Sequence, residues 1–130
     1  MRLATEIQID WDDLDAFGHV NNLAILRYVQ TSRIRVCEEA GLMKGSTRPD
    51  HGPILAATGC RYLRLLYYPG VVRVESVVTE VRHTSFLIRH TILDDAGNTA
   101  ATAEDVLVYF DYLHEEKMPV PDALRARLSA

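Results

Sequence analysis

The 130-residue sequence is short of cysteine, of positive charge and of long apolar runs, and each shortage excludes a class of protein. Its two cysteines, Cys37 and Cys60, form no CxxC pair and match no zinc or redox spacing, so we expect both to be reduced and at least half-buried. The net charge of −4 argues against a general attraction to nucleic acid or to an acidic membrane. No apolar stretch approaches the ~20 residues of a membrane span.

Motifs that mark several enzyme classes are also missing. The sequence has no GxSxG, Walker or GxGxxG pattern. "HEEK" at 114–117 begins like a zinc-protease motif, but Met118 stands where a second histidine is required, so we expect no bound metal. The first ten residues, "MRLATEIQID", lack the apolar segment of a signal peptide. Together with reduced cysteines, this predicts a cytoplasmic protein.

The first third of the chain changes from strand-like to helical periodicity. Residues 5–11 alternate, with Trp11 on the apolar face, which predicts a half-buried strand. From 22 to 40 the apolar residues recur on one side at helical spacing, and Arg33 interrupts this stripe. Gly41 stands where such a helix usually ends.

The remainder favours strands. Residues 44–53 form a loop by composition, and "PDALRARL" predicts a short terminal helix that starts at Asp122. Four strand-like runs lie between them, at 54–67, 71–82, 84–93 and 99–111. One strand, one long helix and four antiparallel strands predict a single α+β domain over residues 1–130. Since one helix buries only one face of such a sheet, we expect the other face to meet a second subunit or a ligand.

The stretch "DAFGHVNN", residues 15–22, concentrates polar side chains just before the predicted helix. Helix capping explains part of it, because Asn21 and Asn22 are both good N-cap residues. Asp15 is suited to a turn closed by its own side chain, and Gly18 to a positive φ. One asparagine is enough for a cap, however, so Asp15, Gly18 and His19 call for a second explanation.

The same segment is suited to acyl transfer. A helix N-terminus presents unpaired N–H groups that polarise a carbonyl as it becomes an oxyanion. Asp15, a few residues upstream, can activate water or attack that carbonyl directly. No strong general acid is visible, which favours a substrate with a good leaving group. A thioester qualifies, because a thiol with a pKa of about 8.5 leaves readily as thiolate.

At these residues the sequence resembles a known family. "WDDLDAFGHVNN" is similar to the active-site segment of hotdog-fold acyl-CoA thioesterases, in the 4-hydroxybenzoyl-CoA thioesterase group and its acyl-carrier-protein relatives. "CRYLRLLYYPG", "VRHTSFLIRHTI" and "MPVPDALRARL" resemble later segments of that family. The resemblance implies one hotdog domain, in which a five-stranded, mainly antiparallel sheet wraps a long central helix. It also implies a homodimer or homotetramer with active sites between subunits, and no cofactor.

The resemblance assigns roles to individual residues. Asp15 matches the catalytic aspartate, as general base or nucleophile. Gly18 and His19 match the positions whose backbone amides polarise the thioester carbonyl at the head of the helix. In the acyl-carrier-protein branch the histidine is itself catalytic and an asparagine follows two positions after the aspartate. Phe17 stands there in this sequence, which favours the aspartate-centred mechanism. Asn22 is assigned mainly as a cap, beside the substrate.

The family also places the coenzyme phosphates near the strand equivalent to "VRHTSF". By that analogy Arg82, Thr84 and Ser85 are candidate phosphate contacts, since a basic residue beside two hydroxyls suits a phosphate. A solvated hairpin end is the alternative for these three residues. Phe17, Tyr28 and Tyr62 are candidates for the acyl pocket, or for the core.

The sequence therefore predicts an acyl-CoA thioesterase that releases a free acid and CoA. Three alternatives stay open: a thioesterase for acyl-carrier-protein thioesters, a non-catalytic acyl-CoA-binding module, and a hydratase acting on enoyl-CoA. Asp15 argues against the binding module, because a pure binder gains little from a carboxylate beside a thioester carbonyl. Nucleic acid and membranes are not expected as partners.

Overall fold

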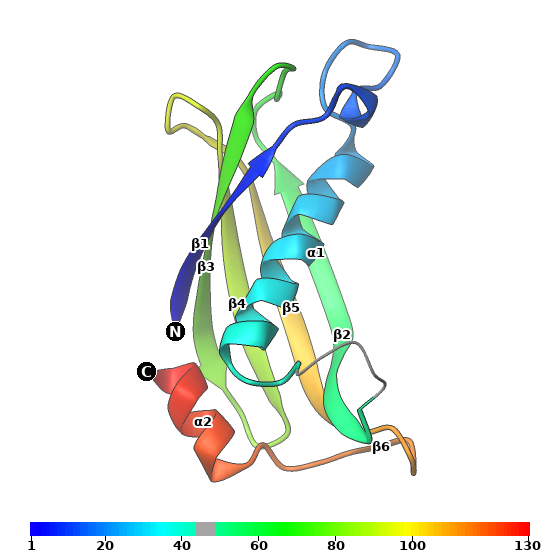
Figure 1. Cartoon of the computed structure of the whole chain (residues 1–130), viewed down its shortest axis with the longest axis vertical. Coiled ribbons are helices and arrows are strands. Elements are labelled where there is room, and N and C mark those ends of the chain that lie inside the picture. Colours follow the sequence, from blue (N-terminus) through cyan, green and yellow to red (C-terminus); the bar gives the residue numbers. More distant parts are fainter. Residues whose placement is uncertain (44–48) are drawn as a thin grey trace.

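One curved sheet with a long helix across its concave face makes up most of the molecule (Figure 1). The computed structural model describes residues 1–43 and 49–130. The helices are α1 (Asn22–Glu39) and α2 (Asp122–Ser129), and a single 3-10 turn, η1, lies at Trp11–Asp13. The strands are β1 (Arg2–Gln8), β2 (His51–Tyr62), β3 (Val71–Val81), β4 (Ser85–Leu93), β5 (Thr99–Asp111) and β6 (Glu116–Lys117). The predicted α+β class is confirmed.

The order of the strands in the sheet differs from their order in the chain. The sheet runs β1–β3–β4–β5–β2, and all of these neighbours are antiparallel. The two-residue strand β6, which the sequence did not predict, pairs with the end of β5. The four later runs form strands as predicted, and β2 pairs with β5, which is not its neighbour in the chain. This arrangement leaves β1 and β2 as the two edges of the five long strands.

Local signals explain where α1 begins and ends. The Asn21 side chain accepts a hydrogen bond from the Leu23 amide at 2.8 Å, which makes Asn21 the N-cap. At the other end Gly41 has a φ of 79°, a conformation that costs glycine little. The Leu42 amide then donates to the Cys37 carbonyl at 2.9 Å, which completes the glycine-based ending.

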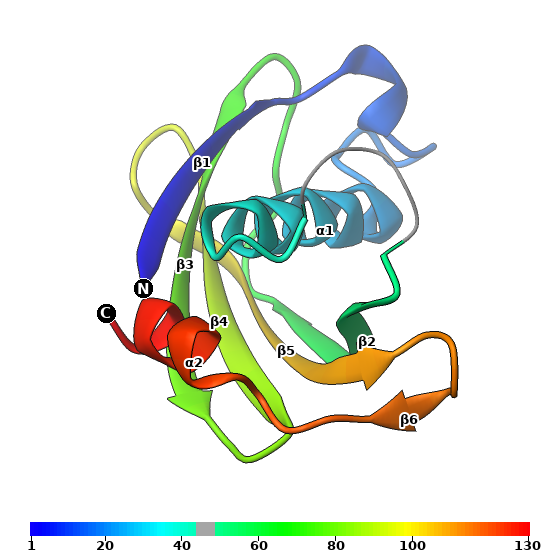
Figure 2. The same ribbon diagram turned by 60° about the horizontal axis from the view of Figure 1, so that its bottom comes forward.

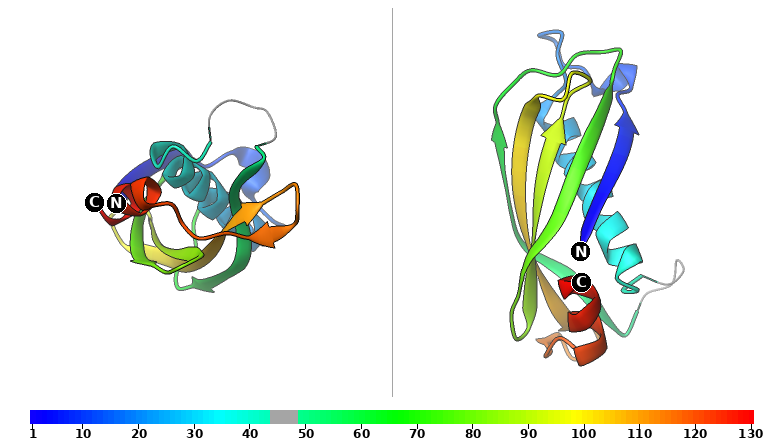
Figure 3. Two further views of the ribbon diagram at one scale, coloured as in Figure 1. Left: turned by 90° about the horizontal axis from the view of Figure 1, so that it is seen from below. Right: turned by 90° about the vertical axis from the view of Figure 1, so that its left-hand side faces the viewer.

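Helix α1 lies along the concave face of the curved sheet (Figures 2 and 3). The core between them consists of two apolar clusters. The cluster beside the first half of α1 contains Ile25 and Val29, and the cluster beside the second half contains Val36 and the α2 residue Leu128. Cys37 is fully buried and Cys60 is partly buried, and both are free thiols, as predicted. Burial raises the pKa of Cys37 to about 12, so this thiol stays protonated.

Three sequence-based boundaries need correction. The first strand ends at Gln8, and Trp11 lies in η1 with 71% of its surface exposed. The run at 54–67 was expected to be strand throughout, but β2 ends at Tyr62 because the next two amides turn to share the Ala100 carbonyl. Of the predicted loop at 44–53, residues 44–48 lie outside the described part, whereas β2 already begins at His51.

The outer face of the sheet carries charged side chains. Arg73 lies 3.9 Å from Glu6 and 3.6 Å from Glu75, and Arg89 donates to Glu104 at 3.3 Å. Antiparallel sheets commonly expose such a polar face to water. The expectation that this face meets a second subunit or a ligand stays a prediction.

Candidate active site

The segment "DAFGHVNN" forms a tight loop that is closed by main-chain hydrogen bonds. The Asp15 amide donates to the His19 carbonyl at 3.0 Å, and the Asn21 amide donates to the Asp13 carbonyl at 2.9 Å. Gly18 turns the chain with a φ of 83°, as predicted, and nothing lies within 4 Å of where its Cβ would be. The structure therefore brings Asp15, Gly18 and His19 together.

Asp15 uses one carboxylate oxygen within the loop and leaves the other unbonded. The Phe17 amide donates to Asp15 Oδ1 at 2.8 Å, which is the side-chain-closed turn that the sequence predicts. Asp15 Oδ2 lies 3.8 Å from His19 Nδ1, beyond hydrogen-bond distance. About a quarter of the Asp15 side chain is exposed (24%), so a carboxylate oxygen faces an accessible surface.

The His19 side chain is also partly exposed, with 28% of its surface accessible. Its Nδ1 lies 3.2 Å from the Val20 carbonyl, and because a carbonyl only accepts, this contact assigns the ring proton to Nδ1. The ring of Phe17, which is 86% exposed, stacks on the His19 ring at 6.4 Å between centroids. The His19 amide donates no hydrogen bond to any residue of the described chain.

The amides expected at the head of the helix lie instead in the loop before it. Helix α1 starts at Asn22, so Gly18 and His19 precede its first turn. The Gly18 amide is already engaged with the Asp15 carbonyl at 3.2 Å. The expectation of two unpaired amides at the helix start is therefore corrected. Of the two, only the His19 amide is without a hydrogen-bond partner among the described residues.

The N-cap of α1 is Asn21. The assignment of Asn22 as the cap was therefore wrong. Asn22 is the first helical residue, and its side chain is exposed. Tyr62, at the end of β2, is its neighbour: burial raises the pKa of Tyr62, and the Asn22 side chain opposes that rise. Of the other pocket candidates, Phe17 is exposed, whereas Tyr28 is 1% exposed and belongs to the core.

A buried carboxylate that the sequence analysis missed fixes this loop to the helix. Asp13, 2% exposed, accepts hydrogen bonds from the Tyr28 hydroxyl at 2.7 Å, the Asp10 amide at 3.0 Å and the Arg27 guanidinium. Burial alone would raise the pKa of Asp13, but these donors hold it below its ordinary value. The loop carrying Asp15 therefore starts from a rigid anchor.

A second polar group missed by the sequence analysis lies inside the core. His90 Nδ1 is 2.7 Å from Ser76 Oγ, and its Nε2 is 2.8 Å from Asp105 Oδ2. Thr58 donates to the other Asp105 oxygen at 2.7 Å. The contacts run from serine to histidine to aspartate, as in a hydrolase triad. All three residues, Ser76, His90 and Asp105, are at most 1% exposed, so no substrate reaches this serine. The sequence signal for this group was the presence of polar residues at the inward-facing positions of strands whose residues alternate between the two faces of the sheet.

The candidate phosphate contacts lie at the opposite end of the sheet from Asp15 (Figure 1). The Ile9 amide donates to Gly70 at 2.9 Å, which places the loop beside the start of β3. Arg82 follows the end of this 11-residue strand, roughly 35 Å away at ~3.3 Å per residue. Arg82 is paired with Glu80 at 3.0 and 3.2 Å, and Ser85 is 9% exposed. One chain alone does not bring Arg82, Thr84 and Ser85 to Asp15.

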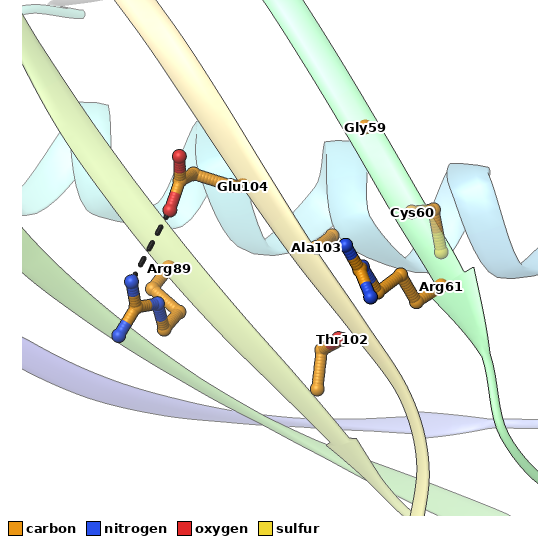
Figure 4. Close-up of a pocket in the computed structure, with 7 residues that line it drawn as sticks. All are labelled: Gly59, Cys60, Arg61, Arg89, Thr102, Ala103 and Glu104. Atoms are coloured by element: carbon orange, nitrogen blue, oxygen red, sulfur yellow. Dashed lines mark hydrogen bonds and ion pairs between the residues drawn. The ribbon is translucent and has the colours of Figure 1, made fainter.

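Two other features of the structure resemble ligand sites. Asp10, Asp12 and Asp13 place one oxygen each within 4.8 Å of one another, but both Asp13 oxygens already accept hydrogen bonds. A hollow of about 550 Å³ on the outer face is lined by Arg61, Arg89 and Glu104 among others, with α1 behind the sheet (Figure 4). Neither feature includes the Asp15 loop.

Comparison with known proteins identifies the family. A sequence model described as the thioesterase-like superfamily matches residues 9–128. The chain belongs to this superfamily. The thioesterase matches no curated protein sequence. None of its described helices has the length and apolar character needed to cross a bilayer.

Solved structures share the fold over nearly the whole thioesterase. A proposed thioesterase from Pseudomonas aeruginosa is 26% identical, with a TM-score of 0.85 and 95% of each chain covered. A thioesterase from Thermus thermophilus, solved with coenzyme A and zinc, is 25% identical, with a TM-score of 0.83 and coverage of 98% of this chain and 97% of that one. A predicted thioesterase from Bacillus stearothermophilus has a TM-score of 0.90 at 22% identity, covering 99% of this chain and 95% of that one. The family assignment and these neighbours make the chain a thioester hydrolase.

Proposed function

We propose that the thioesterase hydrolyses acyl-CoA, with Asp15 as the reacting carboxylate and the His19 amide as the donor to the thioester oxygen. The observation that carries this proposal is the shared loop, in which an unbonded carboxylate oxygen and an unpaired amide lie four residues apart. Coenzyme A in the Thermus thermophilus neighbour supports CoA as the carrier, ahead of acyl-carrier protein.

The same geometry serves two routes to hydrolysis. As a nucleophile, an Asp15 oxygen bonds to the thioester carbon and the thiolate leaves, after which water cleaves the resulting anhydride. As a general base, Asp15 takes a proton from water while the water oxygen bonds to the same carbon. The C–S bond then breaks, the thiolate leaves, and Asp15 gives its proton to the departing sulfur. In either route negative charge develops on the carbonyl oxygen, and a fixed amide that needs no reorientation stabilises it. The products are the free acid and CoA.

The active unit proposed is a homodimer joined at β2. All but three of the 12 residues of β2 are exposed, and the edge away from β5 is unpaired within the described chain. A long unpaired edge is a template for another strand. Antiparallel pairing of β2 with β2 of a second copy would turn the partner end for end. The hairpin of the partner that carries Arg82, Thr84 and Ser85 would then lie toward the Asp15 end, where a phosphate contact is useful.

Thiol release from a panel of acyl-CoAs tests the assignment of Asp15. Asp15→Asn keeps the size of the side chain and its hydrogen bond to Phe17, but it removes the negative charge. We expect a loss of at least about 100-fold in kcat, the lower range for removal of an acid–base group. Asp12→Asn is the matched control, because Asp12 is an exposed carboxylate of the neighbouring 3-10 turn.

Each other outcome of this panel has a definite meaning. Equal activity of wild type and Asp15→Asn would show that Asp15 is not the reacting group. Binding of acyl-CoA without any thiol release would favour the acyl-CoA-binding module. Turnover of acyl-carrier-protein thioesters alone would replace CoA by the protein carrier.

A further inference from the structure

Arg33 is an unusual side chain in this structure. It lies in the middle of α1, and only 11% of its side chain is exposed. It donates no hydrogen bond to any described residue, and its buried Nη1 atom is left unsatisfied. Buried arginine nitrogens are nearly always hydrogen-bonded, so this one requires an explanation.

The nearby acid does not provide that hydrogen bond. Arg33 Nη1 lies 3.3 Å from Asp105 Oδ2, an ion-pair distance without hydrogen-bond geometry. Asp105 is already engaged, because its Oδ2 contacts His90 and its Oδ1 accepts from Thr58. Arg33 is therefore balanced in charge but still has free N–H donors.

Arg33 is one of the residues that line a groove between α1 and β2. The groove has a volume of about 270 Å³, and it is lined by Leu23, Leu26, Arg27, Gln30, Arg33 and Thr58. Two guanidinium groups and no carboxylate line it. Their acidic partners, Asp13 and Asp105, are buried behind the wall with 1% and 0% of their side chains exposed. A ligand in the groove meets donors and positive charge first.

The position and size of the groove connect it to the reaction. It begins at Leu23 in the first turn of α1, directly after the Asp15 loop, and reaches Arg33 ten residues, or about 15 Å, further along. Its volume of about 270 Å³ lies just below the roughly 300–1,000 Å³ of typical small-molecule pockets. That suits a short acyl group and is far too small for the coenzyme.

We propose that this groove receives a short acyl group that ends in a carboxylate, and that Arg33 is the residue that selects it. The proposal rests on the proposed acyl-CoA thioesterase function. The thioester carbonyl would lie at the His19 amide, and the far carboxylate would accept the unused N–H groups of Arg33. The preferred substrates would then be half-thioesters of short dicarboxylic acids.

A pair of substrates of equal shape tests this selection. Glutaryl-CoA ends in a carboxylate, and 5-methylhexanoyl-CoA carries an isopropyl group in its place. We expect wild type to favour glutaryl-CoA by about 10- to 100-fold in kcat/KM, the range of a charge-assisted hydrogen bond. Arg33→Met should bring this ratio close to one. Arg35→Met should leave it unchanged, because Arg35 is exposed on the same helix and does not line the groove.

Other results would overturn the selection by Arg33. A wild type that prefers 5-methylhexanoyl-CoA, or a ratio that survives Arg33→Met, contradicts it. An equal rise in KM for both substrates would mean that Arg33 contacts the coenzyme. A loss of dimer by sedimentation velocity with an unchanged ratio would mean that Arg33 meets the second subunit. If Arg33→Met fails to fold, Arg33→Gln, which keeps a polar side chain, gives the same comparison.

Binding of the free acids separates this proposal from the thioesterase assignment. If wild type releases thiol from no acyl-CoA of the panel, the proposed acyl-CoA activity fails, but titration calorimetry with glutarate and 5-methylhexanoate still reports on the groove. Tighter binding of glutarate that is lost in Arg33→Met supports the selection. Equal binding of the two acids, or no binding of either, rejects it.

Discussion

At the scale of single residues, Asp13 determines where Asp15 lies. Its carboxylate joins η1 to the second turn of α1 through the Tyr28 hydroxyl, and its carbonyl holds the Asn21 amide at the far end of the loop. The position of Asp15, the proposed reacting residue, therefore depends on a second carboxylate that is buried. Asp13 is a positioning residue, and its effect should appear in turnover more than in substrate binding.

Asp13→Asn should separate these two effects. The amide keeps the shape of the side chain but loses the negative charge that accepts hydrogen bonds from Tyr28 and Arg27. We therefore expect the free energy of unfolding to fall by about 2 kcal/mol. We also expect kcat to fall at least tenfold with KM within about twofold, because loop displacement weakens transition-state contacts first. Denaturant unfolding and steady-state kinetics measure the two quantities. A variant that is destabilised with unchanged kcat would leave Asp13 with a structural role only, and Asp12→Asn is again the control.

At the scale of elements, the sequence was informative about local structure and silent about long-range pairing. The helix 22–40, its glycine ending and the turn closed by Asp15 were predicted because neighbouring residues determine them. The pairing of β2 with β5 was not, since strand periodicity identifies a strand and not its neighbour. For the same reason Arg33 appeared only as a break in an apolar stripe. Its neighbour Asp105 lies 72 residues away and could not be recognised from spacing.

The free edge of β2 gives a prediction at this scale. If two copies join there, the β2 amides that point away from β5 should be protected from hydrogen exchange at high protein concentration. They should lose this protection on dilution, because the protecting strand belongs to another molecule. The outward amides of β1, the opposite edge of the sheet, are the internal control and should exchange quickly at every concentration. Fast, concentration-independent exchange along β2 would rule out this dimer.

At the scale of the whole molecule, Asp105 joins four elements through one buried carboxylate. It lies on β5, contacts His90 of β4, accepts from Thr58 of β2 and lies beside Arg33 of α1. It also lies between the two apolar clusters. Along β4 and β5, His90 and Asp105 follow the residues of one cluster and precede those of the other. We therefore expect the packing of the helix on the sheet to depend on this carboxylate being ionised.

The dependence of stability on pH should show this role. Burial alone would raise the pKa of Asp105, but hydrogen bonds from His90 and Thr58 and the charge of Arg33 hold it below the ordinary value of 3.8. Because the native pKa is the lower one, the stabilisation is fully present above about pH 4 and is lost as the pH falls through the native pKa. Asp105→Asn should lower the free energy of unfolding at pH 7 by about 3 kcal/mol and flatten the decline below pH 4. Part of the decline in stability below pH 4 should remain in Asp105→Asn, because the pKa of Asp13 is also lowered in the folded protein. Urea unfolding from pH 7 to pH 2.5 measures both effects, and an unchanged acid limb in Asp105→Asn would assign the pH dependence to other carboxylates.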